Sequence, residues 1–166
     1  MTKFLLSLHV LAAILAIGPI TVAASMFPRY ARPAAPGDGG APGQDLRTAA
    51  FLHRICRVYA TVGIAVPVLG IATGAAMGVL GDAWLMASIV LTGVAAGILL
   101  ALVLPGQEEL LETPLAGEGA TEPDESEAPT RRRATARLAM TTGIFNLLWA
   151  AVVVLMVVRP GSTTGA

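Results

Sequence analysis

The sequence predicts an all-α integral membrane protein, a polytopic up-down bundle of four transmembrane helices with both termini outside. Of its 166 residues, 55% are hydrophobic and only 13% are charged, whereas soluble domains carry about 25% charged residues. Four stretches contain the roughly 20 apolar residues that a helix needs to cross the hydrocarbon core. Arginines are concentrated at one end of the predicted helices, and this asymmetry predicts the direction in which each helix crosses the membrane. We therefore expect a single membrane domain over residues 1–166.

The predicted helices follow from these four stretches in order. None contains an acidic side chain, and a chain in lipid must satisfy its own backbone hydrogen bonds, so each stretch is expected to be a helix. The expected spans are residues 4–26, 51–80, 83–104 and 138–158. We expect flexible cytoplasmic loops at residues 31–44, which are rich in Pro, Gly and Ala, and at residues 107–130, which hold eight of the eleven acidic residues.

Basic residues set the predicted orientation. Only Lys3 and Arg159 lie at one end of the predicted helices, and the other nine basic residues lie at the opposite end. These nine are Arg29, Arg32, Arg47, Arg54, Arg57, Arg131, Arg132, Arg133 and Arg137. By the positive-inside rule, the arginine-rich end is cytoplasmic and both termini face out. The preference for arginine over lysine and the high alanine content are typical of GC-rich bacteria, so we expect a multi-pass protein of the bacterial cytoplasmic (inner) membrane.

The first span has two different faces when it is wound at 3.6 residues per turn. One face carries large aliphatic side chains: Leu8, Leu11, Leu15 and Val22. Another carries His9 with small residues: Ala12, Ala13, Ala16 and Ala23. Small residues mark helix contacts in membranes because they let backbones approach closely. The pattern therefore predicts that His9 points into the bundle.

Glycines form the strongest pattern in the second and third spans. One face of the second span carries Gly63, Pro67, Gly70, Gly74 and Gly78, and the third span carries Gly93 and Gly97 as a GxxxG pair. Such steps allow close helix crossing, so we expect these residues to pack the second span against the third. The alternative is that the glycines clear space for a flat cofactor or a lipid tail.

His9 is the candidate cofactor ligand, because polar side chains inside a bilayer are costly and often functional. At a similar depth the topology places Met77, Met86 and Met156, and an imidazole with a thioether is a known haem ligand set. A hydrogen-bonded structural histidine is the alternative interpretation. His53 is expected at the cytoplasmic interface, too far from His9 to share one haem with it. Asn146, inside the fourth span, is expected to hydrogen-bond to a neighbouring helix.

The sequence predicts no catalytic residue and no metal site built from protein ligands. It contains no Walker loop, no HExxH motif and no acidic residue inside a span, which argues against a pump or a proton-coupled transporter. Cys56 is the only cysteine and is expected to be a buried small hydrophobe. The net formal charge is zero and by itself says nothing about nucleic acid. The expected partners are the lipid bilayer and a second copy or another membrane subunit, with no nucleic acid.

Several short motifs are similar to those of known membrane families. They are Leu8-His9-Val10-Leu11-Ala12-Ala13, Gly18, Phe27-Pro28-Arg29-Tyr30 and the stretch from Pro67 to Gly74 in the second span. On these residues the chain resembles the bacterial integral membrane family called domain of unknown function 2269. More distantly it resembles the HemJ type of protoporphyrinogen oxidase and the CopD copper-resistance membrane domain.

The resemblance implies a four-helix membrane protein in which His9 matches the first-helix haem-ligand candidate of the HemJ type. The tryptophan of that enzyme pattern is replaced by small residues around Ala16, and the third span has no lysine. We therefore expect a non-enzymatic accessory or oligomeric membrane component. The alternatives are a haem-b- or quinone-associated redox protein, which as an enzyme would be a HemJ-like oxidoreductase, and a copper-handling membrane domain.

Overall fold

The computed structural model describes residues 2–32, 43–112 and 127–161, and these residues form helices joined by short turns, with no strand among them. The elements are α1 (Thr2–Tyr30), α2 (Gln44–Gly63), α3 (Ala65–Met77), α4 (Ala83–Ile98), a π-helical turn η1 (Leu99–Val103), α5 (Leu104–Glu112) and α6 (Glu127–Val158). Four helical segments are long and apolar enough to cross a membrane: Thr2–Tyr30, Gln44–Met77, Ala83–Glu112 and Pro129–Val158. The all-α fold class with four membrane-crossing helices is confirmed.

The helices run further at the arginine-rich end than the predicted spans did. The third segment continues to Glu112 instead of residue 104, and the fourth begins at Glu127 instead of residue 138. Residues 107–112 and 127–130, expected in a loop, are therefore helical; the rest of the expected loops, 33–42 and 113–126, lies outside the described residues. Hydropathy detects only the part of a helix inside hydrocarbon, whereas these extensions are held by packing of one buried face, as at Leu110 and Thr135.

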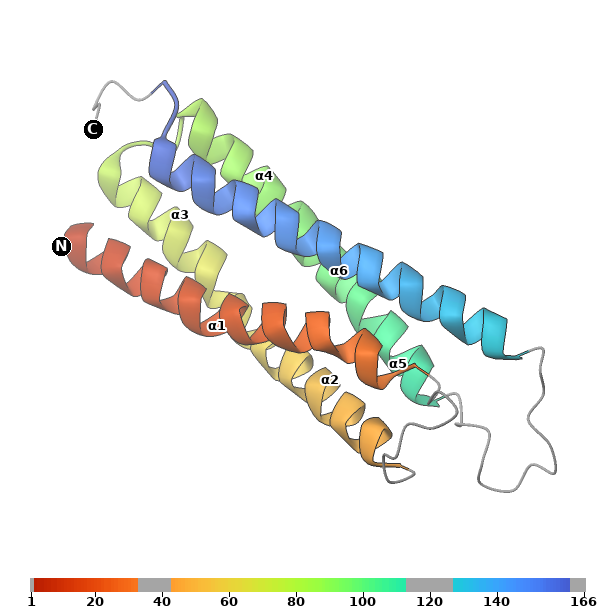
Figure 1. Ribbon diagram of the computed structural model, residues 1–166. Helices are drawn as coiled ribbons and strands as arrows, with labels where there is room; N and C mark the ends of the chain where they lie inside the picture. The colour runs from red at the N-terminus through yellow and green to blue at the C-terminus, as the bar shows by residue number, and fades with distance from the viewer. Residues whose placement is uncertain (1, 33–42, 113–126, 162–166) are drawn as a thin grey trace.

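The second membrane segment is interrupted between α2 and α3. Pro67 has no backbone N–H and cannot donate to the carbonyl of Gly63, one turn earlier. The chain responds with a tighter turn, in which the Ile64 N–H donates to the Thr61 carbonyl at 3.2 Å. The prediction placed Pro67 on a packing face, but its side chain is exposed, so its effect is on the backbone. α3 then continues alongside α1 (Figure 1).

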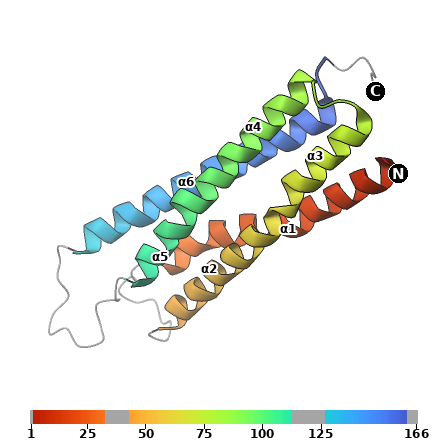
Figure 2. The same cartoon turned by 180° about the vertical axis from the view of Figure 1, so that it is seen from behind.

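The four membrane segments lie side by side (Figures 1 and 2). α1 packs along both α2 and α3, and α4 packs along α6. The glycines predicted close packing of the second span against the third. α3 packs mainly against α1 instead, and contact with α4 is found at Gly74, where a Cβ would lie 2.8 Å from Leu85 Cδ2. The short turn after α3 therefore joins a helix that packs mainly on α1 to a helix, α4, that packs mainly on α6.

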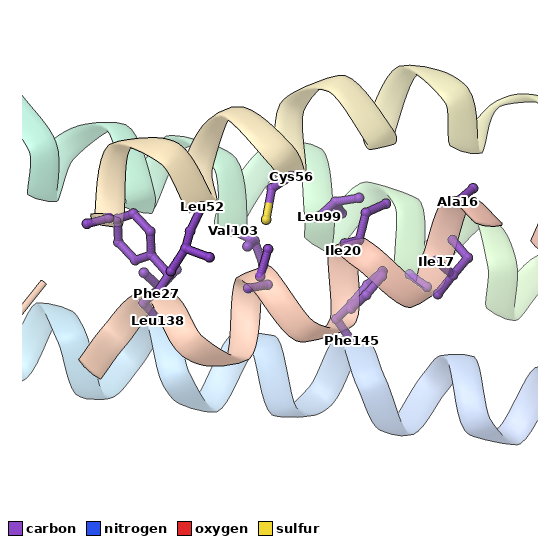
Figure 3. Packing of buried hydrophobic residues seen from close by; sticks show 14 of the residues in the cluster. Ala16, Ile17, Ile20, Phe27, Leu52, Cys56, Leu99, Val103, Leu138 and Phe145 are labelled. Atoms are coloured by element: carbon purple, nitrogen blue, oxygen red, sulfur yellow. The ribbon is translucent and has the colours of Figure 1, made fainter. Parts of the chain in front are cut away.

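α1 supplies the centre of the apolar core (Figure 3). Three of its alanines, Ala16, Ala23 and Ala24, are 0–2% exposed, and they let the neighbouring helices approach closely. The larger core side chains come from every segment: Ile17, Ile20, Phe27, Leu52, Cys56, Leu99, Val103, Leu138 and Phe145. The two predicted faces of the first span are found, since Leu8, Leu11, Leu15 and Val22 are 38–58% exposed on the side away from the core.

Arg131 ties three helices together at the arginine-rich end. Its Nε donates to the carbonyl of Ala31, just past the end of α1, and one terminal nitrogen donates to the carbonyl of Leu110 in α5, both at 3.1 Å. The last carbonyls of a helix lack intrahelical donors and carry partial negative charge, so a guanidinium is a favourable partner for them. This contact fixes the start of α6 against the ends of α1 and α5.

Candidate functional site

His9 lies on the inward face of α1, as its helical position predicted. Its side chain is 7% exposed, and its Nδ1 lies 3.0 Å from the backbone carbonyl oxygen of Val66 in α3. A carbonyl oxygen can only accept a hydrogen bond, so Nδ1 carries the proton and donates it. In the neutral ring this leaves the lone pair on Nε2, the nitrogen that could bind a ligand.

Gly70 of α3 lies directly against the His9 ring. A Cβ atom built on Gly70 would lie 2.9 Å from Cε1 of the ring and 3.6 Å from Nε2. No real side chain is tolerated at such a distance without displacing the ring. The predicted close approach at Gly70 therefore exists, but its partner is His9 of α1 rather than a helix backbone of the third span.

The three methionines proposed as companions of His9 lie on three different helices, α3, α4 and α6. Met77 lies seven residues beyond Gly70, which is about 10 Å along the axis of α3. Met86 is 52% exposed on the outside of α4, and Met156 of α6 is half-buried. Two open surface hollows, on α1 around Val10 and on α5 around Glu108, do not include His9 in their linings. The hydrogen bond to Val66 leaves Nε2 of His9 as the candidate ligand atom, and a methionine partner stays a prediction.

The remaining glycines divide into two groups. Gly74 is buried under Leu85 of α4 and Leu80 of the α3–α4 turn, because a Cβ built there would lie 2.8 Å from Leu85 Cδ2 and 3.3 Å from Leu80 Cδ2. Cβ atoms built on the others would meet nothing within 4 Å in the described part of the chain; these are Gly63, Gly78, Gly93 and Gly97. Gly78 has a positive φ of 71° and ends α3 in the left-handed conformation that suits glycine, which is a capping role.

A second polar cluster joins α2 to α5 near the arginine-rich end. Nδ1 of His53 lies 3.0 Å from Oε1 of Gln107, and Nε2 of Gln107 donates to Sγ of Cys56 at 3.7 Å. Gln107 and Cys56 are fully buried and His53 is 8% exposed. His53 is therefore a buried hydrogen-bonding residue near the arginine-rich end, and its expected place at the cytoplasmic interface stays a prediction.

Glu108 closes the outer side of this cluster. One of its carboxylate oxygens lies 3.5 Å from Nε2 of His53 and 3.9 Å from a terminal nitrogen of Arg57. Both ring nitrogens of His53 thus face oxygen atoms. Sequence reasoning missed Gln107 because it lies beyond the last apolar residue of the third span; the only signal was one amide side chain following Pro105 and Gly106.

Asn146 is a further polar residue inside the helices, and its expected hydrogen bond to a neighbouring helix is confirmed. Its Nδ2 donates to Oγ of Ser25 in α1 at 3.1 Å. Among the residues that the structure describes, no group of three or more His, Cys, Asp or Glu side chains is placed to hold a metal ion.

Comparison with known proteins places the chain in one group. The model of a family described as "Predicted integral membrane protein (DUF2269)" matches residues 3–160. No curated protein and no solved structure matches the chain. The match covers all four membrane segments, and it confirms the resemblance to this family that the motifs around His9 and Pro28 indicated.

Proposed function

Because the chain belongs to DUF2269, a family of predicted integral membrane proteins, we propose that it is a non-enzymatic membrane component that assembles with a second copy of itself through α4. The proposal rests on the position of Gly93 and Gly97. Both glycines are exposed in the middle of a membrane segment, and side chains added there would meet nothing within the described chain. A GxxxG pair in a transmembrane helix is a common contact between helices.

The glycine pair belongs to a longer exposed seam on α4 and η1. The seam residues repeat at alternating intervals of four and three, the spacing that keeps residues on one side of a helix. They are Met86, Val90, Gly93, Gly97 and Leu100, and the three larger side chains are 52–60% exposed. A seam that is used by both partners in the same way gives a closed two-fold dimer, which is the commonest symmetric assembly.

The proposed location is the bacterial cytoplasmic membrane with the arginine-rich end inside. Exposed arginines at that end come from three different helices: Arg29, Arg47, Arg54, Arg57, Arg132, Arg133 and Arg137. This distribution supports the orientation in which both termini face out. A periplasmic reporter enzyme fused after Val158 should be active, and a cytoplasmic reporter at the same point should be inactive.

Leucine at both Gly93 and Gly97 should abolish self-association, because the added side chains keep the two α4 helices apart. The measurement is energy transfer between donor- and acceptor-labelled full-length chains in lipid vesicles, as a function of protein-to-lipid ratio. Gly18→Leu is the matched control, since Gly18 is also an exposed glycine without neighbours but lies in α1. Equal transfer in the wild type and the double variant would refute the α4 interface.

A haem-b- or quinone-associated redox protein is the second candidate function, and the His9 hydrogen bond is the observation that favours it. Histidines that bind metals usually donate their other ring N–H to a carbonyl or carboxylate, as His9 does to Val66. If haem were bound, His9 Nε2 would hold its iron, and the haem would supply electron transfer. The methionines support no second ligand, so only the His9 bond is proposed.

The second candidate predicts a Soret band from the wild-type protein purified in mild detergent after expression with ample haem. The band should shift on reduction with dithionite and disappear in His9→Ala. Thr73→Ala serves as a control, because Thr73 is a buried polar residue of α3 whose hydroxyl bonds only within its own helix. A colourless wild-type protein would reject the haem candidate and leave the self-association proposal unaffected.

A further inference from the structure

Two polar atoms on the inner face of α6 are buried without a hydrogen-bond partner. They are Oγ1 of Thr142 and Oδ1 of Asn146. Thr142 is 2% exposed, and its hydroxyl differs from those of Thr73 and Thr141, which donate to the carbonyl one turn back in their own helices. Buried polar atoms are almost always partnered in native proteins, so each such atom calls for a physical explanation.

A third group without its usual partner lies across the interface in α1. Pro28 has no N–H, so the carbonyl of Ala24 cannot receive the hydrogen bond that a helix normally provides from the residue four positions later. Ala24 is fully buried and Pro28 is also buried. The gap in the hydrogen-bond ladder of α1 therefore faces the interior of the protein rather than lipid.

The register between α1 and α6 brings these groups to one level. Asn146 bonds to Ser25, the residue after Ala24. Phe27 of α1 belongs to the same buried cluster as Leu138 of α6, which lies one turn from Thr142 toward the arginine-rich end (Figure 3). The Ala24 carbonyl points along α1 toward residue 28 and the arginine-rich end, which is also the direction in which Thr142 lies from Asn146 along α6.

We propose that Thr142, Asn146 and the Ala24 carbonyl bind one buried water molecule between α1 and α6. Water has two donors and two acceptor positions, so it can donate to Asn146 Oδ1 and to the Ala24 carbonyl while it accepts from the Thr142 hydroxyl. Buried waters typically make about three such bonds. Residues four apart on a helix have Cβ atoms about 5–6 Å apart, which two hydrogen bonds of about 2.8 Å through one oxygen can span.

The surroundings favour water over a charged ligand. The side chains of the core cluster are apolar, among them Val103 and Phe145. No acidic side chain of the described residues lies within the hydrocarbon part of a span. An uncompensated ion would be costly there, whereas a neutral molecule with three partners is not. The water would also join α1 to α6 where the proline weakens the α1 backbone.

Radiolytic labelling of the full-length protein in lipid nanodiscs with oxygen-18 water tests the proposal, because radicals formed at a bound water oxidise the side chains next to it. Wild-type Phe145, although 2% exposed, should acquire label. In Thr142→Val, which has the same shape without the hydroxyl, the label on Phe145 should fall to background. Thr73→Val is the control and should leave Phe145 labelled, because its hydroxyl is already bonded to Leu69.

Thermal unfolding separates the remaining outcomes. If water is bound, Thr142→Val should lower the midpoint, because Asn146 and Ala24 lose their shared partner. Absence of label in the wild type together with a raised midpoint in Thr142→Val would overturn the proposal, since it would mean that the hydroxyl is buried without any partner. A wild-type midpoint that rises with sodium chloride but not with choline chloride would also overturn it, in favour of an alkali cation at the same oxygens.

Discussion

Leucine at Gly70 should lower the free energy of unfolding by about 1–3 kcal/mol, the usual cost of overpacking a well-filled interior. The reason is that even a Cβ at this position would lie 2.9 Å from the His9 ring. That ring is held in place by its hydrogen bond to Val66, one turn earlier on the same helix. The larger side chain must therefore break the bond or separate α1 from α3. Unfolding of the purified protein by sodium dodecyl sulfate in mixed micelles gives the measurement.

Two comparisons make the Gly70 prediction specific. Gly63→Leu changes a glycine of the same membrane segment that has no neighbour within 4 Å, so it should cost much less. Removing the ring should also relieve the clash, so Gly70→Leu should be less destabilising in a His9→Ala background than in the wild type. Equal losses for Gly63→Leu and Gly70→Leu would show that His9 does not rest on Gly70.

Leucine at Gln107 should destabilise the protein by about 1–3 kcal/mol, the cost of leaving a buried hydrogen-bonding group without its partner. Gln107 is fully buried, and its side chain links His53 to Cys56. Leucine fills similar space but cannot accept the hydrogen bond from His53, so Nδ1 of the imidazole would be left unpaired between α2 and α5. The same detergent titration measures the loss.

A double-mutant cycle tests whether the loss at Gln107 comes from the His53 contact. Replacing both partners by apolar groups can be nearly neutral, because no buried polar group is then stranded. His53→Phe combined with Gln107→Leu should therefore be more stable than Gln107→Leu alone. Strictly additive losses in the double variant would show that the two side chains are not coupled and would contradict the hydrogen bond described here.

Several features could be predicted from single helices. Hydropathy located all four membrane segments, because transfer into hydrocarbon depends on each segment's own composition. The two faces of α1 followed from helical periodicity: His9 is buried and Leu15 is 57% exposed. The hydrogen bond of Asn146 could be expected because an amide inside a bilayer needs a partner. Each of these properties depends only on the sequence of one helix and on whether lipid or water surrounds it.

Other features depended on which helices meet. Gly70 and Gly93 each have a second glycine four residues later, yet Gly70 contacts the His9 ring while Gly93 lies on an exposed face. Gln107 looked like a loop residue, and only the packing of α5 on α2 makes it a buried partner of His53. The polar groups of Thr142 and Ala24 lie far apart in the chain, and only the packing of α6 against α1 relates them.

The sequence by itself therefore determined the number of membrane segments, their approximate limits and the inward face of α1. The tertiary structure alone decided that α3 packs on α1, that α4 packs on α6 and that the α4 glycines remain exposed. The physical reason is that lipid is as apolar as leucine. Hydrophobicity separates a membrane segment from water, but it does not distinguish a helix face that meets lipid from one that meets another helix; close packing and interhelical hydrogen bonds make that choice.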